Sequence, residues 1–260
     1  MRRWYWPIAS CCALLWPLCG AAADVHVMIS AGFFGVYSEL GPAFEKETGH
    51  HLVTTRGPSL GDSPESIPTR LGRGEPADVA ILDGASADEL ASRSLVDPAT
   101  KTVLALSQIG MVVKEGAAKP DISTVDAFRK ALLEAKSIAY SDSGSGTYIR
   151  AKMMARLGIA DQVAAKSRKI RGPPSGEPVA AVVARGEAEI GFQQVSELIH
   201  VKGITYVGAI PAELQPGFTF AGVIARGAKE REAGEALIRF LASAQAAPVI
   251  ARAGLTPPPR

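Results

Sequence analysis

The sequence has three cysteines, and all of them lie near its start, at Cys11, Cys12 and Cys19. The three tryptophans lie in the same segment. If this segment is removed on export, as argued below, the remaining chain has no thiol. Disulfides, cysteine nucleophiles and thiolate metal sites are then excluded. The fold must depend on burial alone, which a chain of this length can provide.

The sequence also lacks an excess of charge and a long hydrophobic run. Its 28 basic and 26 acidic residues leave a net charge of +2, and losing Arg2 and Arg3 would make the balance neutral. A broad basic face for nucleic acid is therefore not expected. No apolar run reaches the roughly 18 residues that span a bilayer, so membrane insertion is not expected. The prolines and glycines follow no period, which excludes a collagen-like chain.

What is present begins with an export signal. Two arginines follow the initiating methionine, and a short apolar run at 8–18 leads to Ala21 and Ala23. This small-x-small pattern is the kind that signal peptidase accepts, so residues 1–23 are predicted to be a signal peptide for the periplasm. The alternative is a lipoprotein signal at Cys11. That cysteine lies too near the N-terminus to leave an apolar core ahead of it.

Short apolar strands then alternate with segments of helical periodicity. Strands are expected at 25–29, 51–55, 77–82, 137–140, 168–171, 189–192 and 218–225. Helices are expected at 36–48, 65–73, 123–134 and 177–185, with two more near the C-terminus, around 233–241 and 246–253. This alternation is typical of βαβ units, and it predicts an α/β fold with parallel sheets covered on both faces.

Two such blocks predict two lobes with a cleft between them. We expect residues 24–106 and 222–260 to form the first lobe and residues 107–221 to form the second. Ligands in open α/β sheets bind beyond the carboxyl ends of the strands. The loops that follow strands here, at 30–35, 56–63, 141–147 and 172–176, are all rich in glycine, serine or proline.

These loops offer groups that bind anions. Backbone N–H groups at helix starts attract negative charge, and the guanidinium of Arg56 can grip a carboxylate with two hydrogen bonds. Each candidate also has a purely structural interpretation as a helix cap, a turn residue or a surface charge. The candidate binding residues are Ser30, Gly32, Phe33, Arg56, Ser59, Ser63, Ser143, Gly144, Ser145, Thr147, Arg171, Gln193 and Gln194.

Several common kinds of catalytic site are missing. The four histidines do not have metal-ligand spacing with another histidine or acid on one helix face. There is no G-x-S-x-G elbow. The segment 144–147 (GSGT) lacks the lysine of a phosphate-binding loop. We therefore expect neither a metal nor a cofactor.

Three motifs carry a family resemblance. Residues 44–49 (FEKETG), 74–79 (GEPADV) and 185–191 (RGEAEIG) resemble periplasmic molybdate-binding proteins, which belong to the type II solute-binding family of ABC importers. The similarity covers the whole chain after residue 23. It implies the two-lobed type II fold, with a ligand cleft between the lobes.

The cleft loops depart from that family. A serine is usual where Gly32 aligns, and a tyrosine is replaced by Gln194. The second loop is longer and contains Arg56 and Asp62. A tetrahedral oxyanion needs only N–H and O–H donors, whereas an added arginine suits planar carboxylates. The expected ligand is therefore a small polycarboxylate.

Four runs, at 27–33, 54–59, 107–113 and 193–197, resemble one branch of the family, the exported bacterial aconitate isomerases. The resemblance implies that trans- and cis-aconitate interconvert by an allylic proton shift, which requires a base. Without cysteine, the base must be a carboxylate, tyrosine, histidine or lysine. Asp62 and Asp142 lie in cleft loops and are the candidates, although either can instead cap a helix or turn.

The alternative is a non-catalytic solute-binding protein. It would deliver the same polycarboxylate, or a molybdate-like oxyanion, to an ABC permease. It needs the same cleft but no base, and fold alone does not separate the two functions. In either case we expect a monomer.

Overall fold

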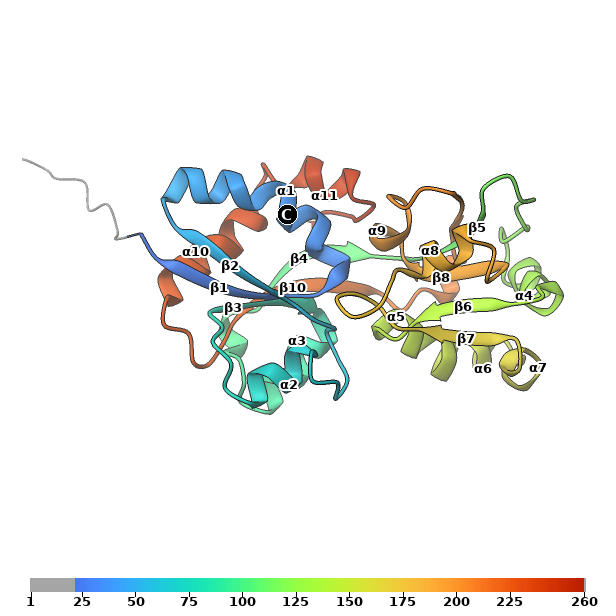
Figure 1. Ribbon diagram of the computed structural model, residues 1–260, viewed down its shortest axis with the longest axis horizontal. Helices are drawn as coiled ribbons and strands as arrows, with labels where there is room; N and C mark the ends of the chain where they lie inside the picture. The colour runs from blue at the N-terminus through green and yellow to red at the C-terminus, as the bar shows by residue number, and fades with distance from the viewer. Residues whose placement is uncertain (1–21, 260) are drawn as a thin grey trace, which may run out of the picture.

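The computed structural model describes residues 22–259, so all but two residues of the predicted signal peptide lie outside it. Two five-stranded sheets lie side by side along the long axis of the molecule (Figure 1). We call the half built on each sheet the first and the second lobe. The first sheet has the order β2 (His51–Arg56), β1 (Asp24–Ile29), β3 (Val79–Asp83), β10 (Phe218–Ile224), β4 (Thr102–Ser107). The second has the order β7 (Ser167–Ile170), β6 (Ile138–Ser141), β8 (Ile190–Gln194), β5 (Ile109–Lys114), β9 (Ile204–Ala209).

Helices cover both sheets. The first lobe has α1 (Ala31–Thr48), α2 (Ile67–Gly72), α3 (Gly84–Ser92), α10 (Arg231–Leu241), α11 (Ala247–Arg252) and the short 3₁₀ turn Pro98–Thr100. The second lobe has α4 (Val125–Glu134), α5 (Gly144–Tyr148), the π turn Ile149–Met153, α6 (Met154–Arg156), α7 (Ala160–Ala164), α8 (Val179–Ala184) and α9 (Val195–Leu198). A 3₁₀ turn, Ala212–Leu214, precedes β10. No helix in the described part of the chain is long and apolar enough to cross a membrane.

The prediction of parallel sheets holds for only part of each sheet. In the first sheet β1 pairs in parallel with β2 and β3, but β10 runs antiparallel to β3 and β4. In the second sheet β6 pairs in parallel with β7 and β8, whereas β5 runs antiparallel to β8 and β9. Strands buried on both faces appear as continuous apolar runs whatever their direction. The direction of each strand therefore has to be inferred from the connections between strands.

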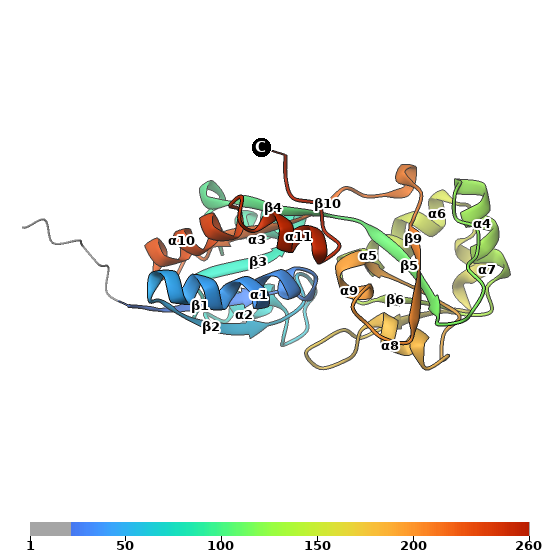
Figure 2. The same ribbon diagram turned by 90° about the horizontal axis from the view of Figure 1, so that it is seen from above.

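The connections between the lobes explain the antiparallel strands. A mostly apolar segment at 103–113 forms most of two strands, β4 and β5, which are separated by Gln108 and belong to different sheets. The chain returns from β9 to β10, which completes the first sheet (Figure 2). Within residues 22–259 the chain thus crosses between the lobes twice. β10 spans the predicted lobe boundary at 221/222.

Helix α1 begins earlier than its apolar spacing predicts. Its buried face includes Phe33, Val36, Leu40 and Phe44, and Gly49 ends it in the left-handed conformation, with its N–H bonded to the carbonyl of Glu45. The glycines and alanine of the predicted loop at 30–35 hide the first turn, because they show no apolar period. The C-terminal helices α10 and α11 pack with α1 in the first-lobe core.

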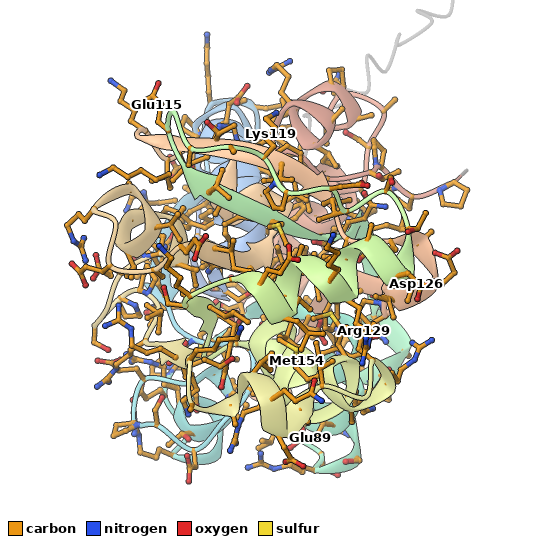
Figure 3. All side chains as sticks on the ribbon, turned by 90° about the vertical axis from the view of Figure 1, so that its right-hand side faces the viewer. Glu89, Glu115, Lys119, Asp126, Arg129 and Met154 are labelled. Atoms are coloured by element: carbon orange, nitrogen blue, oxygen red, sulfur yellow. The ribbon has the colours of Figure 1, made fainter. Side chains whose placement is uncertain are left out.

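The second lobe has its own core. The rings of Phe128 and Phe192 meet edge to face at 5.8 Å between centroids. At the far end of this lobe, Nε of Arg129 on α4 donates to the carbonyl of Leu157 at 3.0 Å and fixes α4 against the segment after α6 (Figure 3). Each sheet therefore has a separate core.

Candidate functional site

A cavity lies between the lobes, where the carboxyl ends of β1, β2, β3 and β6 meet β8 and α9. It encloses about 470 Å³ counted out to open solvent. Hydrogen bonds between the lobes, from Ser196 to Gly32 and from Arg171 to Glu65, hold it closed. The lining residues are Ser30, Ala31, Gly32, Gly57, Pro58, Ser59, Asp83 and Phe220 from the first lobe, and Ser141, Asp142, Ser143, Gly144, Gly172, Pro173, Gln193, Gln194 and Glu197 from the second.

The structure brings eight of the predicted site residues to this cavity. They are Ser30, Gly32, Ser59, Asp142, Ser143, Gly144, Gln193 and Gln194. Others lie away from it. Phe33 is fully buried in the first-lobe core, Ser145 is buried behind the cavity wall, and Thr147 is exposed. Asp62 and Ser63 lie in the second loop outside the cavity, and Asp62 is exposed.

The first-lobe wall carries polar atoms that have no protein partner. Five buried side-chain polar atoms in residues 22–259 lack a hydrogen bond. Three of them are Oγ of Ser30, Nε of Arg56 and Oδ2 of Asp83, which stand at the ends of β1, β2 and β3. Unpaired buried polar groups cost free energy, so their concentration at one place indicates a ligand site.

Ser30 is the N-cap of α1, but its side chain makes no capping hydrogen bond. An N-cap serine ordinarily bonds a backbone N–H of the first helical turn. Here the hydroxyl and the first-turn N–H groups both stay available at the cavity. This helix start can donate several hydrogen bonds to one anion.

Arg56 lies beside the cavity and is not part of its lining. Its guanidinium carbon is 4.0 Å from the ring centroid of Phe34, a cation–π contact. Burial lowers the pKa of Arg56 below its usual value, and the nearby charge of Glu197 acts in the opposite direction. The guanidinium is thus a positive charge held close to the carboxyl group of Glu197.

Gly32 allows a close approach to Phe220. A Cβ atom at position 32 would lie 2.2 Å from Cζ of that ring. A serine, which the family resemblance places here, does not fit while Phe220 occupies this position. The aromatic ring therefore replaces a hydroxyl in the cavity wall.

The second-lobe wall is held together by its own hydrogen bonds. The hydroxyl of Ser141 lies 2.7 Å from that of Ser143 and 3.1 Å from that of Ser145. The N–H of Gly172 donates to Oδ1 of Asp142 at 3.0 Å, which joins the third and fourth predicted loops. These contacts fix the loop positions before any ligand arrives.

Gln193 positions Glu197. The N–H of Val179 donates to Oε1 of Gln193 at 3.1 Å, and Nε2 of Gln193 donates to Oε2 of Glu197 at 2.6 Å. The first bond fixes which way the amide points, and the second anchors one oxygen of the carboxyl group. The other oxygen, Oε1, has no hydrogen bond to the described residues.

Glu197 has a perturbed acidity. It is half-buried and lines the cavity. Burial, with a further contribution from the charge of Asp142, raises its pKa to about 7, while Gln193 and Arg56 act in the opposite direction. A carboxyl group with this pKa is divided between its two protonation states at neutral pH, which suits a general base.

Asp83 is a second buried carboxyl group, on the opposite wall. It is 4% exposed, and burial raises its pKa. Oδ1 accepts hydrogen bonds from the N–H groups of Ala85 and Ser86 at the start of α3. Its backbone N–H donates to Oγ of Ser59.

Side chains also bond across the mouth of the cavity. Oγ of Ser196 donates to the carbonyl of Gly32 at 2.8 Å. Glu65 of the first lobe accepts from Arg171 at 3.2 Å and from Ser175 at 2.5 Å, both in the second lobe. Arg171 is therefore an interlobe contact at the surface and does not line the cavity.

The described residues, 22–259, contain no group of three or more histidine, cysteine, aspartate or glutamate side chains placed to hold a metal ion. The cavity offers N–H groups, hydroxyls, amides and carboxyl groups. These groups can bind an organic anion and move a proton.

Sequence reasoning missed two of the carboxyl groups in the cavity. Glu197 ends the run 193–197 on which the family resemblance rests, but it was not singled out. Asp83 directly follows an apolar strand and precedes a glycine, the same signal that marked the other loops. The strand predicted there ends at residue 82, and the four predicted cleft loops do not include the residues after it.

The fold is shared with known binding proteins. The periplasmic molybdate-binding protein of Azotobacter vinelandii superposes with a TM-score of 0.72 over 90% of this chain and 100% of that chain, at 22% identity. The sulfate-binding protein SubI of Mycobacterium tuberculosis gives 0.69 over 90% of this chain and 87% of that chain, at 19% identity. These likenesses confirm the predicted two-lobed α/β fold.

Two curated relatives are similar in sequence. Aconitate isomerase from Pseudomonas sp is 44% identical over 233 residues, which is 90% of this chain and 87% of the relative. The molybdate-binding protein ModA of Azotobacter vinelandii is 26% identical over 239 residues, 88% of each chain. The family of bacterial extracellular solute-binding proteins matches residues 25–256. The protein belongs to this family.

Proposed function

We propose that the protein is an aconitate isomerase that interconverts trans- and cis-aconitate by an allylic proton shift. The observation that carries the proposal is Glu197, a carboxyl group in a closed cavity with a pKa of about 7. The 44% identity to the Pseudomonas aconitate isomerase supports it. Glu197 replaces Asp62 and Asp142 as the proposed base. Asp62 lies outside the cavity, and Asp142 already accepts a hydrogen bond from the N–H of Gly172.

In the proposed reaction, the carboxylate of Glu197 takes a proton from the methylene carbon of the substrate. The electron pair of that C–H bond spreads over the allyl system and into an adjacent carboxylate. Glu197 then returns the proton to the other end of the allyl system. The double bond has moved, no atom is gained or lost, and Glu197 is ionised again.

The first-lobe side of the cavity is equipped to hold the carboxylates of the substrate. The start of α1 offers the Ser30 hydroxyl and first-turn N–H groups, and Arg56 supplies a positive charge nearby. These groups hold the carboxylates in the substrate and in the transition state alike, so they contribute to affinity and leave kcat unchanged.

The alternative is a passive carrier, as many members of the family are expected to be. An inorganic oxyanion such as molybdate accepts hydrogen bonds only. Three carboxyl groups, those of Asp83, Asp142 and Glu197, line the cavity and repel any anion when ionised, so their charge does not separate molybdate from a polycarboxylate. The guanidinium of Arg56 suits planar carboxylates, which makes a carrier for a polycarboxylate the stronger alternative. It has no need of a carboxyl group with a pKa near 7.

The cellular setting follows from the family. Extracellular solute-binding proteins act outside the cytoplasmic membrane, and the N-terminal pattern at residues 1–23 supports secretion into the periplasm. We propose a small polycarboxylate as the ligand. An ABC permease would be a partner only if the protein is a carrier.

The test is to incubate purified protein with trans-aconitate and to follow cis-aconitate by chromatography, then to repeat the incubation in deuterated water. An isomerase forms product, with solvent deuterium on the new methylene carbon to the extent that Glu197 exchanges its proton before returning it. A carrier binds trans-aconitate but gives neither product nor label. No product at any pH from about 6 to 9, a range that spans the titration of a tuned base, would refute the isomerase proposal.

A further inference from the structure

Asp83 has two carboxyl oxygens in different situations. Oδ1 caps α3 through the N–H groups of Ala85 and Ser86, at 3.0 and 3.3 Å. Oδ2 is buried and has no hydrogen-bond partner among the described residues, and the side chain lines the cavity. The helix cap accounts for Oδ1 alone. Oδ2 needs a partner from outside the protein.

The protonation state of Asp83 follows from what the cavity binds. A buried, unpaired carboxylate oxygen is costly, and bringing the carboxylates of a ligand up to it adds like-charge repulsion. A neutral carboxyl group removes both costs, because the hydroxyl at Oδ2 becomes a donor and a carboxylate is a strong acceptor. Burial raises the pKa of Asp83 and favours this neutral form, whereas the hydrogen bonds that Oδ1 accepts from Ser86 and Ala85 and the nearby charge of Lys101 act in the opposite direction.

We propose that Asp83 recognises one carboxylate of the ligand by donating a hydrogen bond from Oδ2, and that it thereby sets the preference for three carboxylates over two. The inference rests on the proposed polycarboxylate ligand. Asp83 acts in binding on the first-lobe wall. The proton shift belongs to Glu197 on the second-lobe wall.

The first experiment compares two substitutions that both keep a capping oxygen for α3. Asp83→Asn replaces the hydroxyl donor with an N–H donor, so we expect the dissociation constant for trans-aconitate to stay within about threefold. Asp83→Ser lacks the second polar atom, so the ligand carboxylate loses its partner. We expect binding to weaken by roughly tenfold to a hundredfold, the usual consequence of leaving a buried polar group unpaired.

The matched control is Asp97→Ser. Asp97 also caps a short helix of the first lobe, through the N–H of Ala99, but it lies on the surface and outside the cavity. We expect its ligand affinity to equal that of the wild type. Melting curves of all three variants identify any loss of folding before titration.

The second experiment identifies the carboxylate. Glutaconate, itaconate and mesaconate each lack a different one of the three carboxylates of trans-aconitate. Asp83→Ser should weaken binding of two of them about as much as it weakens trans-aconitate. The third lacks the carboxylate that Asp83 binds, so its affinity should change by less than about twofold, which is the non-additivity that marks a direct contact.

The outcomes separate the inference from the proposed function. If the wild type binds none of these acids, the polycarboxylate proposal fails and the inference with it. If the wild type binds trans-aconitate and Asp83→Ser binds it equally well, only the inference fails. Equal losses in Asp83→Asn and Asp83→Ser would show that an ionised acceptor is needed, and equal losses for all four acids would show no direct contact. Either result overturns the inference.

Discussion

The two walls of the cavity are built differently. On the first-lobe wall, Ser30 and Asp83 carry buried polar atoms without partners, and Arg56 beside it carries another. On the second-lobe wall, Asp142, Gln193 and the serines around position 143 bond to one another or to the backbone. One wall is incomplete without a ligand, whereas the other is already ordered.

This difference suggests a division of work. Unpartnered groups gain the most from a ligand, because its acceptors remove the cost of their burial. An ordered network gains less from binding, but it holds a reacting group in place, as Val179 and Gln193 hold Glu197. We therefore expect first-lobe substitutions to change affinity and second-lobe substitutions to change turnover.

The largest effect is expected at the base. Glu197→Gln keeps the size of the side chain but cannot take a proton, so turnover of trans-aconitate should fall by about 100-fold or more, with the dissociation constant within a few-fold of the wild type. Steady-state kinetics measures the turnover, and calorimetric titration measures the dissociation constant. Glu134→Gln, an exposed glutamate on α4, serves as the control. If Glu197→Gln lowers affinity as much as it lowers turnover, the proposed division between a binding wall and a catalytic wall is wrong.

Arg56 tests the link between the walls. Arg56→Ala removes a desolvated charge beside a polyanion, so we expect affinity to fall by roughly 2–5 kcal/mol, or about 30-fold or more. Because the arginine lowers the pKa of Glu197, its loss should also move the acid limb of the rate profile to higher pH. Arg56→Lys keeps the positive charge, so it should return the acid limb most of the way to its wild-type pH. An unmoved limb would show that the two groups do not interact.

Ser30 offers a smaller and cleaner test. Ser30→Ala removes one unpartnered donor, and we expect KM to rise by about fivefold to tenfold with kcat unchanged. Ser243→Ala is the matched control, since its hydroxyl is also buried without a partner but lies outside the cavity. A drop in kcat for Ser30→Ala would place catalysis on the first-lobe wall as well.

The smallest effect is expected at the mouth. Arg171→Ala breaks the interlobe pair with Glu65, which is exposed and therefore contributes little. Ligand affinity should fall by less than about fivefold, and the difference from the wild type should shrink in high salt. Arg168→Ala breaks an exposed pair with Glu187 inside the second lobe and should leave affinity unchanged. A larger loss, insensitive to salt, would mean that Arg171 contacts the ligand.

The sequence predicts much of the fold and part of the site. Apolar periodicity locates most strands and the longer helices, and the strand-end rule brings eight predicted residues to the cavity. Strand direction was not predictable from pattern, because β5 and β10 are as apolar as their parallel neighbours. The same rule, applied to the end of β3, would have found Asp83.

Other residues depend on the third dimension. Arg171 directly follows β7 and Arg56 ends β2, yet Arg171 meets Glu65 of the other lobe at the surface. Asp62 lies in a cleft loop by sequence, but it is exposed. Glu197 is distinguished by burial and by its neighbours Gln193, Arg56 and Asp142. These neighbours come from three separate segments of the chain, so the sequence alone does not reveal its raised pKa.

The central claim is that Glu197, on the ordered wall, is a base with a pKa near 7. The pH dependence of kcat/KM for trans-aconitate tests it most directly, because this ratio follows the essential groups of the free enzyme. Glu197 must be ionised to take a proton, so kcat/KM should rise with pH and level off above an apparent pKa of about 7. A profile that is flat from about pH 5.5 to 8.5, or one whose acid limb lies near the ordinary carboxyl value of about 4, would contradict the account.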